Sequence, residues 1–260
     1  MHPSRPRGIC LFVFALAVAC ITTRAQDKEW NAGEIVSREL FKYGAFEARM
    51  KAAKGSGAIS GFLVINPDAG ETRPWQEIAF EFFGKSDGNE FQTQIIVPGP
   101  EESDIGSLPR SQNMVQHTSD TSIFDNFHTV RMEWTPTKLS FYYEGSLIRE
   151  ETDSSKYEQF FDPSKTEGAN IRATLWAGFS DWSGQVDPSN PPTSVTMDYI
   201  SYEKYDESSG GFVPEWRDDF DSFNSDRWQK ADWTFPFAVN NFSPSNVNIE
   251  DGNLVINFSR

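Results

Sequence analysis

Short runs of alternating hydrophobic and polar residues, separated by glycine and proline, are the feature that most constrains the fold. Such alternation is typical of β-strands with one buried face. The sequence has no comparable helical pattern, and a short helix or turn is expected only over residues 155–161. Many short strands between turn residues predict an all-β protein, an antiparallel β-sandwich of the jelly-roll type. The expected strands are 46–50, 61–65, 78–83, 91–97, 129–134, 139–143, 171–176, 194–202 and 254–258.

The first 25 residues have the pattern of a secretory signal peptide. Two arginines precede an apolar run over residues 10–19, and small residues follow it. The run is too short for a stable membrane anchor. Both cysteines, Cys10 and Cys20, lie in this segment, so a mature chain of residues 26–260 is expected to be secreted without disulfides. A bacterial lipoprotein cleavage site at Cys20 is the alternative.

The charge and the aromatic content narrow the class of partner. The chain has 23 Lys and Arg against 38 Asp and Glu, a formal net charge of -15. Such a charge repels nucleic acid and anionic membranes, and neither is expected as a partner. Aromatic residues make up 14% of the chain, which predicts a large core and rings that stack on the flat apolar faces of sugars.

Glu77 and Glu81 are the residues that point to chemistry. On a strand they share one face with Ala79, while Ile78 and Phe80 lie on the other. Two carboxylates on an apolar-backed wall carry a desolvation cost, which makes a chemical use plausible. Glycoside hydrolysis is the fitting chemistry, because it uses one carboxylate as nucleophile and a second carboxyl group as proton donor. On a flat strand their Cα atoms lie roughly 13 Å apart, so the strand must curve to bring the carboxyls to about 5–5.5 Å for retention or about 6.5–9.5 Å for inversion. The spacing leaves the stereochemistry open, and glutamates facing water on an ordinary strand are the alternative.

The domain organisation depends on a polar, glycine-rich stretch at residues 206–211. It reads as a linker between residues 26–205 and 212–260. The C-terminal piece is too small to be an independent domain without disulfides or metal. We therefore expect it to complete the sheets of a single domain, and we expect that domain to be a monomer.

The segment Glu77-Ile78-Ala79-Phe80-Glu81 resembles a known signature, Glu-[Ile/Val]-Asp-[Ile/Phe/Val]-Glu. The signature belongs to glycoside hydrolase family 16, and within it to the bacterial lichenases, which cleave mixed-linkage 1,3-1,4-β-glucans with retention. Similar segments cover nearly the whole mature chain. They include residues 43–51, 127–136, 175–176 and 198–200. The resemblance implies a concanavalin-like jelly roll, a β-glucan polysaccharide as partner and no required cofactor.

The order of the segments resembles a circularly permuted lichenase of the rumen type. Segments similar to the amino-terminal part of ordinary members come last here, at residues 216–224, 227–228, 232–234 and 248–254. A short linker can join the old ends because the termini of a sandwich often lie close together.

The resemblance also implies roles for individual residues. Glu77 matches the nucleophile and Glu81 the general acid/base. The implied substrate-binding aromatics are Trp75, Trp176 and Trp233; for the last two, a buried core position is the alternative. Asp198 matches a carboxylate that in many members helps to hold a structural calcium.

Ala79 departs from the family, because the signature has an aspartate there. That acid normally supports the nucleophile, so we expect Ala79→Asp to raise turnover. We predict a retaining endo-β-glucanase acting on mixed-linkage 1,3-1,4 or β-1,3 glucans, with the linkage set by loops at 68–74 and 98–116. The alternative is a non-catalytic β-glucan-binding or extracellular matrix protein. Ala79 favours that alternative, and retention of both glutamates favours the enzyme.

Overall fold

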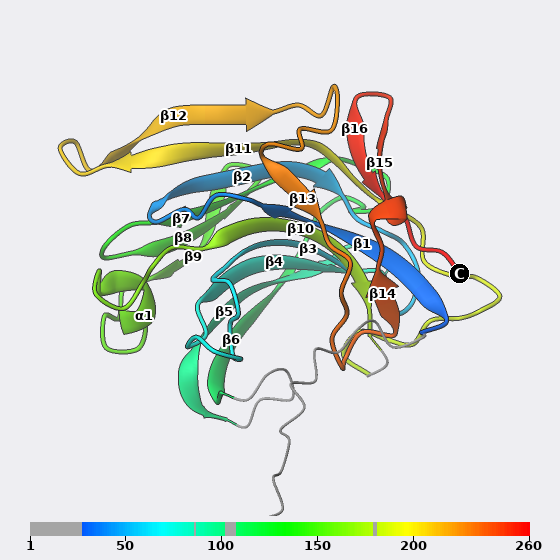
Figure 1. The fold of residues 1–260 in the computed structure, drawn as a ribbon, viewed down its shortest axis with the longest axis horizontal. Helices are drawn as coiled ribbons and strands as arrows, with labels where there is room; N and C mark the ends of the chain where they lie inside the picture. Colours follow the sequence, from blue (N-terminus) through cyan, green and yellow to red (C-terminus); the bar gives the residue numbers. More distant parts are fainter. Residues whose placement is uncertain (1–27, 86, 102–107, 179–180) are drawn as a thin grey trace, which may run out of the picture.

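The protein is a β-sandwich, as a computed structural model of residues 28–85, 87–101, 108–178 and 181–260 shows (Figure 1). Within these residues the strands form two eight-stranded sheets. Neighbouring strands pair antiparallel, except for the parallel pair β1 and β14. The predicted all-β antiparallel sandwich is confirmed. The expected signal peptide, residues 1–25, lies outside the described residues.

One sheet, here called the cleft sheet, carries Glu77 and Glu81. Its strand order is β13-β1-β10-β3-β4-β5-β6, and β14 pairs with β1. Its strands are β1 (Trp30–Ser37), β3 (Ala58–Ile65), β4 (Glu77–Phe83), β5 (Glu90–Glu101), β6 (Arg110–Thr118), β10 (Asn170–Ala177), β13 (Trp228–Lys230) and β14 (Asn240–Phe242). Strand β6 corrects the expectation of a loop over residues 98–116.

The other sheet, here called the outer sheet, covers the back of the cleft sheet. Its order is β15-β16-β11-β2-β7-β8-β9, and β12 pairs with β11. Its strands are β2 (Gly44–Lys51), β7 (His128–Trp134), β8 (Leu139–Tyr143), β9 (Ser146–Glu151), β11 (Val195–Asp206), β12 (Gly211–Asp218), β15 (Val247–Glu250) and β16 (Asn253–Ile256). The helical pieces among the described residues are α1 (Glu158–Phe161) and a 3-10 turn, η1 (Pro244–Asn246).

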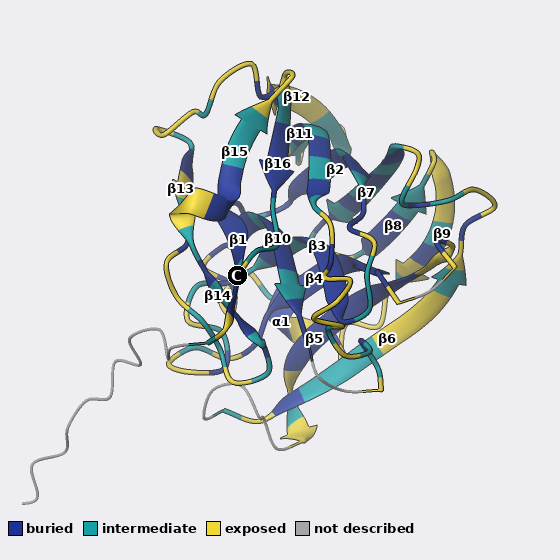
Figure 2. Cartoon of the chain, turned by 90° about the vertical axis from the view of Figure 1, so that its right-hand side faces the viewer, coloured by how far each residue is buried: buried dark blue, intermediate teal, exposed yellow. Residues whose placement is uncertain are grey.

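The core lies between the two sheets, where the strands turn their apolar faces toward each other. Strand β7 alternates buried and half-buried residues along its whole length, as a strand with one buried face must. Its Trp134 is fully buried, and the indole Nε1 donates to the Phe160 carbonyl at 3.0 Å, which ties α1 to the core. Figure 2 shows the buried residues along the facing strands and exposed residues on β6 and the connecting turns.

The C-terminal segment contributes to both sheets. Strands β13 and β14 lie beside β1 in the cleft sheet, while β15 and β16 extend the outer sheet next to β11. The predicted linker at residues 206–211 is the turn of the β11–β12 hairpin, in which Asp206 pairs with Gly211. Asp206 Oδ1 accepts hydrogen bonds from the Ser208 amide and hydroxyl at 3.0 and 2.7 Å, which stabilises the turn.

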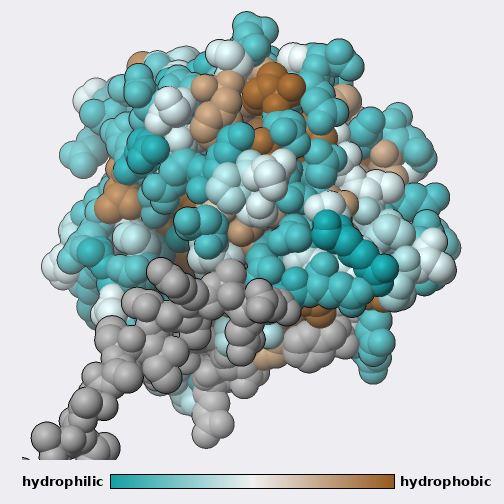
Figure 3. Space-filling model, turned by 45° about the vertical axis from the view of Figure 1, so that its right-hand side comes forward, coloured by the Kyte–Doolittle hydropathy of each residue, from teal (hydrophilic) through white to brown (hydrophobic). Residues whose placement is uncertain are grey.

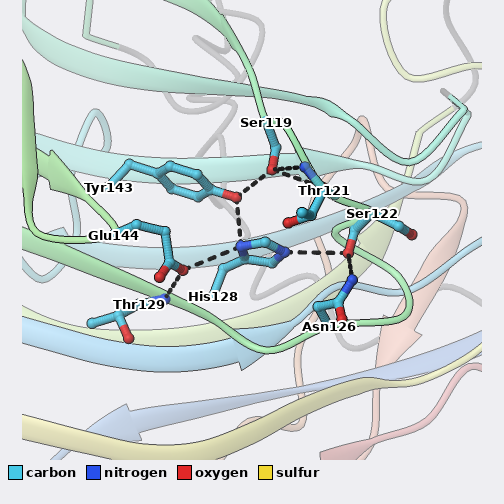
Figure 4. A network of polar contacts seen from close by, with 8 residues as sticks. All are labelled: Ser119, Thr121, Ser122, Asn126, His128, Thr129, Tyr143 and Glu144. Carbon is cyan, nitrogen blue, oxygen red and sulfur yellow. Dashed lines mark hydrogen bonds and ion pairs between the residues drawn. The ribbon is translucent and has the colours of Figure 1, made fainter.

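A partly buried polar network joins the β7–β8 hairpin to the chain after β6 (Figure 4). Tyr143 Oη donates to Ser119 Oγ at 2.7 Å and lies 2.7 Å from His128 Nδ1. Glu144 Oε1 is 3.2 Å from the same nitrogen, and His128 Nε2 is 3.2 Å from the Ser122 carbonyl. The network lies away from the residues that line the cleft.

Figure 3 shows a face that is mostly hydrophilic, with hydrophobic residues in small separate spots. Among the described residues, no helix is long and apolar enough to cross a membrane.

Candidate active site

Strand β4 places Glu77 and Glu81 on the floor of a cavity. Both side chains line a space of about 360 Å³ on the face of the cleft sheet that points away from the core. The alternating Ile78 and Phe80 lie in the core, as the predicted strand requires. Both glutamates are only 5% exposed, so the alternative of an ordinary solvent-facing strand does not describe them.

The strand register sets which side chains flank Glu81. On one side, Glu81 pairs with Gly61 on β3, and Gly61 pairs with Thr174 on β10. Thr174 in turn pairs with Glu34 on β1. Directly opposite residues of antiparallel strands point to the same face. Glu34 is therefore a third carboxylate of the same cavity, which its place in the lining bears out.

On its other side Glu81 is held by a chain of amides. Gln92 Nε2 donates to Glu81 Oε2 at 2.6 Å, and Gln92 Oε1 accepts from Gln116 Nε2 at 2.7 Å and from Trp182 Nε1 at 3.4 Å. The two donors facing Gln92 Oε1 fix the orientation of this amide. Its NH₂ group therefore faces Glu81.

Burial raises the pKa of both β4 carboxyls, because a charged carboxylate loses hydration in the cleft. For Glu77, burial and the neighbouring Glu81 raise the pKa to about 8, against the opposing effect of Arg110 and Arg172. For Glu81, burial raises the pKa to about 7, and the hydrogen bond from Gln92 opposes the rise. Between about pH 7 and 8 the pair holds one proton and one charge, and the higher pKa of Glu77 places that proton mainly on Glu77. The form that acid-assisted attack by Glu77 requires, with the proton on Glu81, is the minor one.

Ala79 has no acidic replacement in its own row of the sheet. It is fully buried and pairs with Leu63 on one side and Gln94 on the other. Leu63 in turn pairs with Arg172. The row beside the two glutamates therefore combines apolar groups, an amide and a cation where the family signature has a carboxylate.

Glu34 and Arg172 form a pair at the edge of the cavity. Arg172 Nη1 lies 3.4 Å from Glu34 Oε1. Burial raises the pKa of Glu34, while the Arg172 charge and a hydrogen bond from Trp233 oppose the rise. The Arg172 guanidinium also lies 6.0 Å from the centre of a Trp233 ring. This pair therefore holds the indole of Trp233.

All three aromatic residues predicted to bind substrate line the cavity, and their exposure differs. Trp233 is 38% exposed, whereas Trp75 is 4% exposed. A Cβ atom at Gly70 would lie 2.2 Å from Trp75 Nε1, so the loop packs directly on this indole. Trp176 lies beside Trp182, with ring centres 5.9 Å apart and ring planes tilted by 34°. Their role in substrate binding stays a prediction.

Several cavity residues were missed from sequence. The sequence did not predict Trp182 or the polar lining residues from β1, β5, β6 and β10. For Trp182, a tryptophan in a glycine-containing turn was an available signal. These lining residues are Glu34, Gln94, Arg110, Gln112, Arg172 and Trp182.

Asp198 lies apart from the cavity, on β11 of the outer sheet. Its Oδ2 accepts from Arg49 Nη1 at 2.5 Å. Within the described part of the chain, no group of three or more His, Cys, Asp or Glu side chains has the arrangement of a metal site. The partner that the structure gives this carboxylate is therefore an arginine, and a structural calcium at Asp198 stays a prediction.

Comparison with known proteins identifies the family. The model of the glycosyl hydrolases family 16 matches residues 18–201. A β-glucanase of Fibrobacter succinogenes is 32% identical over 253 residues, which are 95% of this chain and 68% of the relative. A β-glucanase of Acetivibrio thermocellus is 29% identical over 175 residues, which are 66% of this chain and 46% of the relative.

Solved structures agree on the fold. A lichenase derived from a mouse hindgut metagenome superposes with a TM-score of 0.50 at 21% identity, over 66% of this chain and 78% of that chain. LamAcat from Zobellia galactanivorans gives 0.51 at 15% identity, over 65% and 67%. At such identities the likeness supports the fold alone. Together with the family match over most of its length, the cavity built around Glu77 and Glu81 leads to one conclusion: the chain belongs to the glycosyl hydrolases family 16.

Proposed function

We propose that the protein is a secreted endo-β-glucanase that hydrolyses mixed-linkage 1,3-1,4 or β-1,3 glucans with retention of configuration. The observation that carries the proposal is the pair of buried carboxyls on one cavity floor, each with a raised pKa. The β-glucanase names of its relatives support the substrate class.

The mechanism uses the two glutamates in different roles. Glu77 attacks the anomeric carbon while the glycosidic C–O bond breaks, and Glu81 gives its proton to the leaving oxygen. Water then attacks the anomeric carbon of the glycosyl-enzyme, Glu81 takes its proton, and Glu77 leaves as a carboxylate. The aromatic walls of the cavity, Trp176 and Trp233, suit stacking on the apolar faces of glucose rings.

The test is reducing-sugar release by residues 26–260 from lichenan, barley β-glucan and laminarin. We expect hydrolysis of at least one glucan, with the β-anomer formed first in ¹H NMR, and its loss in Glu77→Gln. Glu81→Ala should lose polymer hydrolysis and keep activity on an aryl glucoside whose leaving group needs no proton. Glu250→Gln, an exposed change on β15, is the matched control.

The competing function is glucan binding without hydrolysis, which Ala79 favours. Under that function, the protein would retain a glucan in affinity electrophoresis and release no reducing ends. An α-anomer as first product would instead contradict the retaining mechanism.

A further inference from the structure

The starting point is the charge around Glu77, and the inference rests on the proposed role of Glu77 as nucleophile. The charged groups that face it come from four strands: Glu81 on β4, Glu34 on β1, Arg172 on β10 and Arg110 on β6. Glu34 and Arg172 form an ion pair, and their charges act on the pKa of Glu77 in opposite directions. Outside this pair, the charged groups are one acid, Glu81, and one cation, Arg110.

The Arg110 guanidinium belongs to the same cavity as Glu77 and is held there by two neighbours. Arg110 is only 7% exposed and lines the same cavity. Its Cζ lies 5.2 Å from the centre of a Trp75 ring, and Trp75 is two residues before Glu77. With the Gln112 amide oriented so that its oxygen faces Arg110, this oxygen accepts from Nη2 at 3.0 Å and Nε at 3.1 Å. Gln112 is in register with Glu77 across β5 through Ile96.

The partners that the structure describes for the Arg110 guanidinium carry no charge. Among the described residues it makes no ion pair, and its contacts are an aromatic ring and a neutral amide. Burying a cation costs hydration free energy, and a nearby opposite charge offsets part of this cost. Arg110 acts electrostatically on Glu77, which lines the same cavity.

We propose that Arg110 is a positioning residue for the nucleophile: its buried guanidinium supports the negative charge of Glu77 from β6, in a site where Ala79 has left the usual neighbouring acid out. The Gln112 amide and the Trp75 ring hold the guanidinium in place. In the absence of a middle carboxylate, a cation supplies the electrostatic support instead of a hydrogen-bonding acid.

The direction of the effect follows from electrostatics. A cation nearby stabilises the ionised carboxylate and lowers its pKa, and Arg110 acts on Glu77 in this direction. Removing the cation raises the pKa of Glu77. The form with Glu77 ionised and Glu81 protonated then becomes rarer, most of all on the acid side of the profile. At high pH the rate is limited by the proton on Glu81, so the loss disappears there.

The experiment compares wild type, Arg110→Met, Arg110→Gln and Arg110→Lys, with Arg217→Met on the outer sheet as the matched control. Glu77 is titrated by ¹³C NMR of the glutamate carboxyls without substrate, and Glu77→Gln assigns the signal. In parallel, kcat/KM is measured against pH on the glucan that the wild type cleaves.

We expect the Glu77 titration midpoint to rise by about one pH unit or more in both neutral variants and to return toward wild type in Arg110→Lys. Each unit corresponds to about a tenfold lower kcat/KM at pH 6, and the gap should narrow toward the alkaline end. An unchanged Glu77 midpoint in a folded Met or Gln variant overturns the proposal, as does a rate loss of the same size at every pH. If no glucan is hydrolysed, the proposed function fails, while the NMR titration still decides the role of Arg110.

Discussion

At the scale of the residue, Glu77 makes stability depend on pH. Its pKa rises from 4.5 to about 8 in the folded protein. A buried carboxyl with a raised pKa lowers the free energy of unfolding as it becomes ionised. This free energy is therefore at its full value below pH 4.5 and decreases as the pH rises through 8. At about 1.4 kcal/mol per pKa unit, the loss reaches roughly 5 kcal/mol.

Glu77→Gln should therefore stabilise the fold in alkaline solution. Gln stays neutral at every pH and has nearly the shape of the protonated glutamic acid. We expect the variant and the wild type to unfold at similar urea concentrations at pH 5, and the variant to be more stable by several kcal/mol at pH 9. Equal differences at the two pH values would contradict the buried, titrating carboxyl. Glu250→Gln on the surface should change neither.

Ala79→Asp should raise turnover and lower stability. The new carboxylate would lie between Glu77 and Glu81 in a fully buried position, where it can hydrogen-bond the nucleophile and where its desolvation destabilises the fold. Ala79→Asn is the control, because Asn offers a similar shape without the charge. The measurements are kcat on the preferred glucan and the urea midpoint. An Asp variant with unchanged or lower kcat would mean that this position is not a missing support.

The two candidate catalytic residues could be predicted from sequence, and much of their surroundings could not. The period of two along β4 was enough to place Glu77 and Glu81 on one face. Arg110 and Glu34 reach the same cavity through sheet register, because β6 lies two strands from β4 and β1 lies three. Strand order is a long-range property that local alternation does not encode.

At the scale of the element, local patterning succeeded where strands have one clearly apolar face. Strand β7 alternates cleanly and was predicted. Strand β6 differs from the predicted loop. It lies at the sheet edge, and its residues Arg110–Thr118 are mostly polar, so they lack the alternation that indicates a strand. Strand β1 was also missed. It is buried along nearly its whole length, although its sequence includes Glu34, Asn31 and Gly33.

Tyr143→Phe tests how the network of Figure 4 joins these elements. The hydroxyl contacts both Ser119 and His128, and its loss leaves their polar groups without this partner. We expect a decrease of about 1–3 kcal/mol in unfolding free energy, measured by urea denaturation, with glucanase activity unchanged. Tyr142→Phe, on the other face of β8, should have a smaller effect. A Tyr143→Phe variant as stable as wild type would mean that the network contributes no net stability.

At the scale of the whole molecule, the two ends of the described chain meet. The Asn31 amide donates to the Ser259 carbonyl at 2.7 Å, and the Ser259 amide donates back to the Asn31 carbonyl at 2.8 Å. Arg260 also pairs with Glu29. The relative from Fibrobacter aligns over 253 residues, whereas the family model ends at residue 201. These observations support our proposal that the chain is circularly permuted relative to ordinary members.

A chain permuted back to the ordinary order should therefore fold. The permuted protein starts at Ser209, joins Arg260 to Lys28 through a short glycine linker and ends at Ser208. We expect it to keep both sheets and its glucanase activity, because the new ends lie in the exposed turn between β11 and β12. Circular dichroism, the urea midpoint and reducing-sugar release measure this. Opening the chain between Phe80 and Glu81 instead divides β4 in the middle of the cleft sheet, and that control should not fold. If the Ser209 permutant is as unfolded as the control, the covalent link between β11 and β12 is needed for folding, and segment order is not interchangeable in this sandwich.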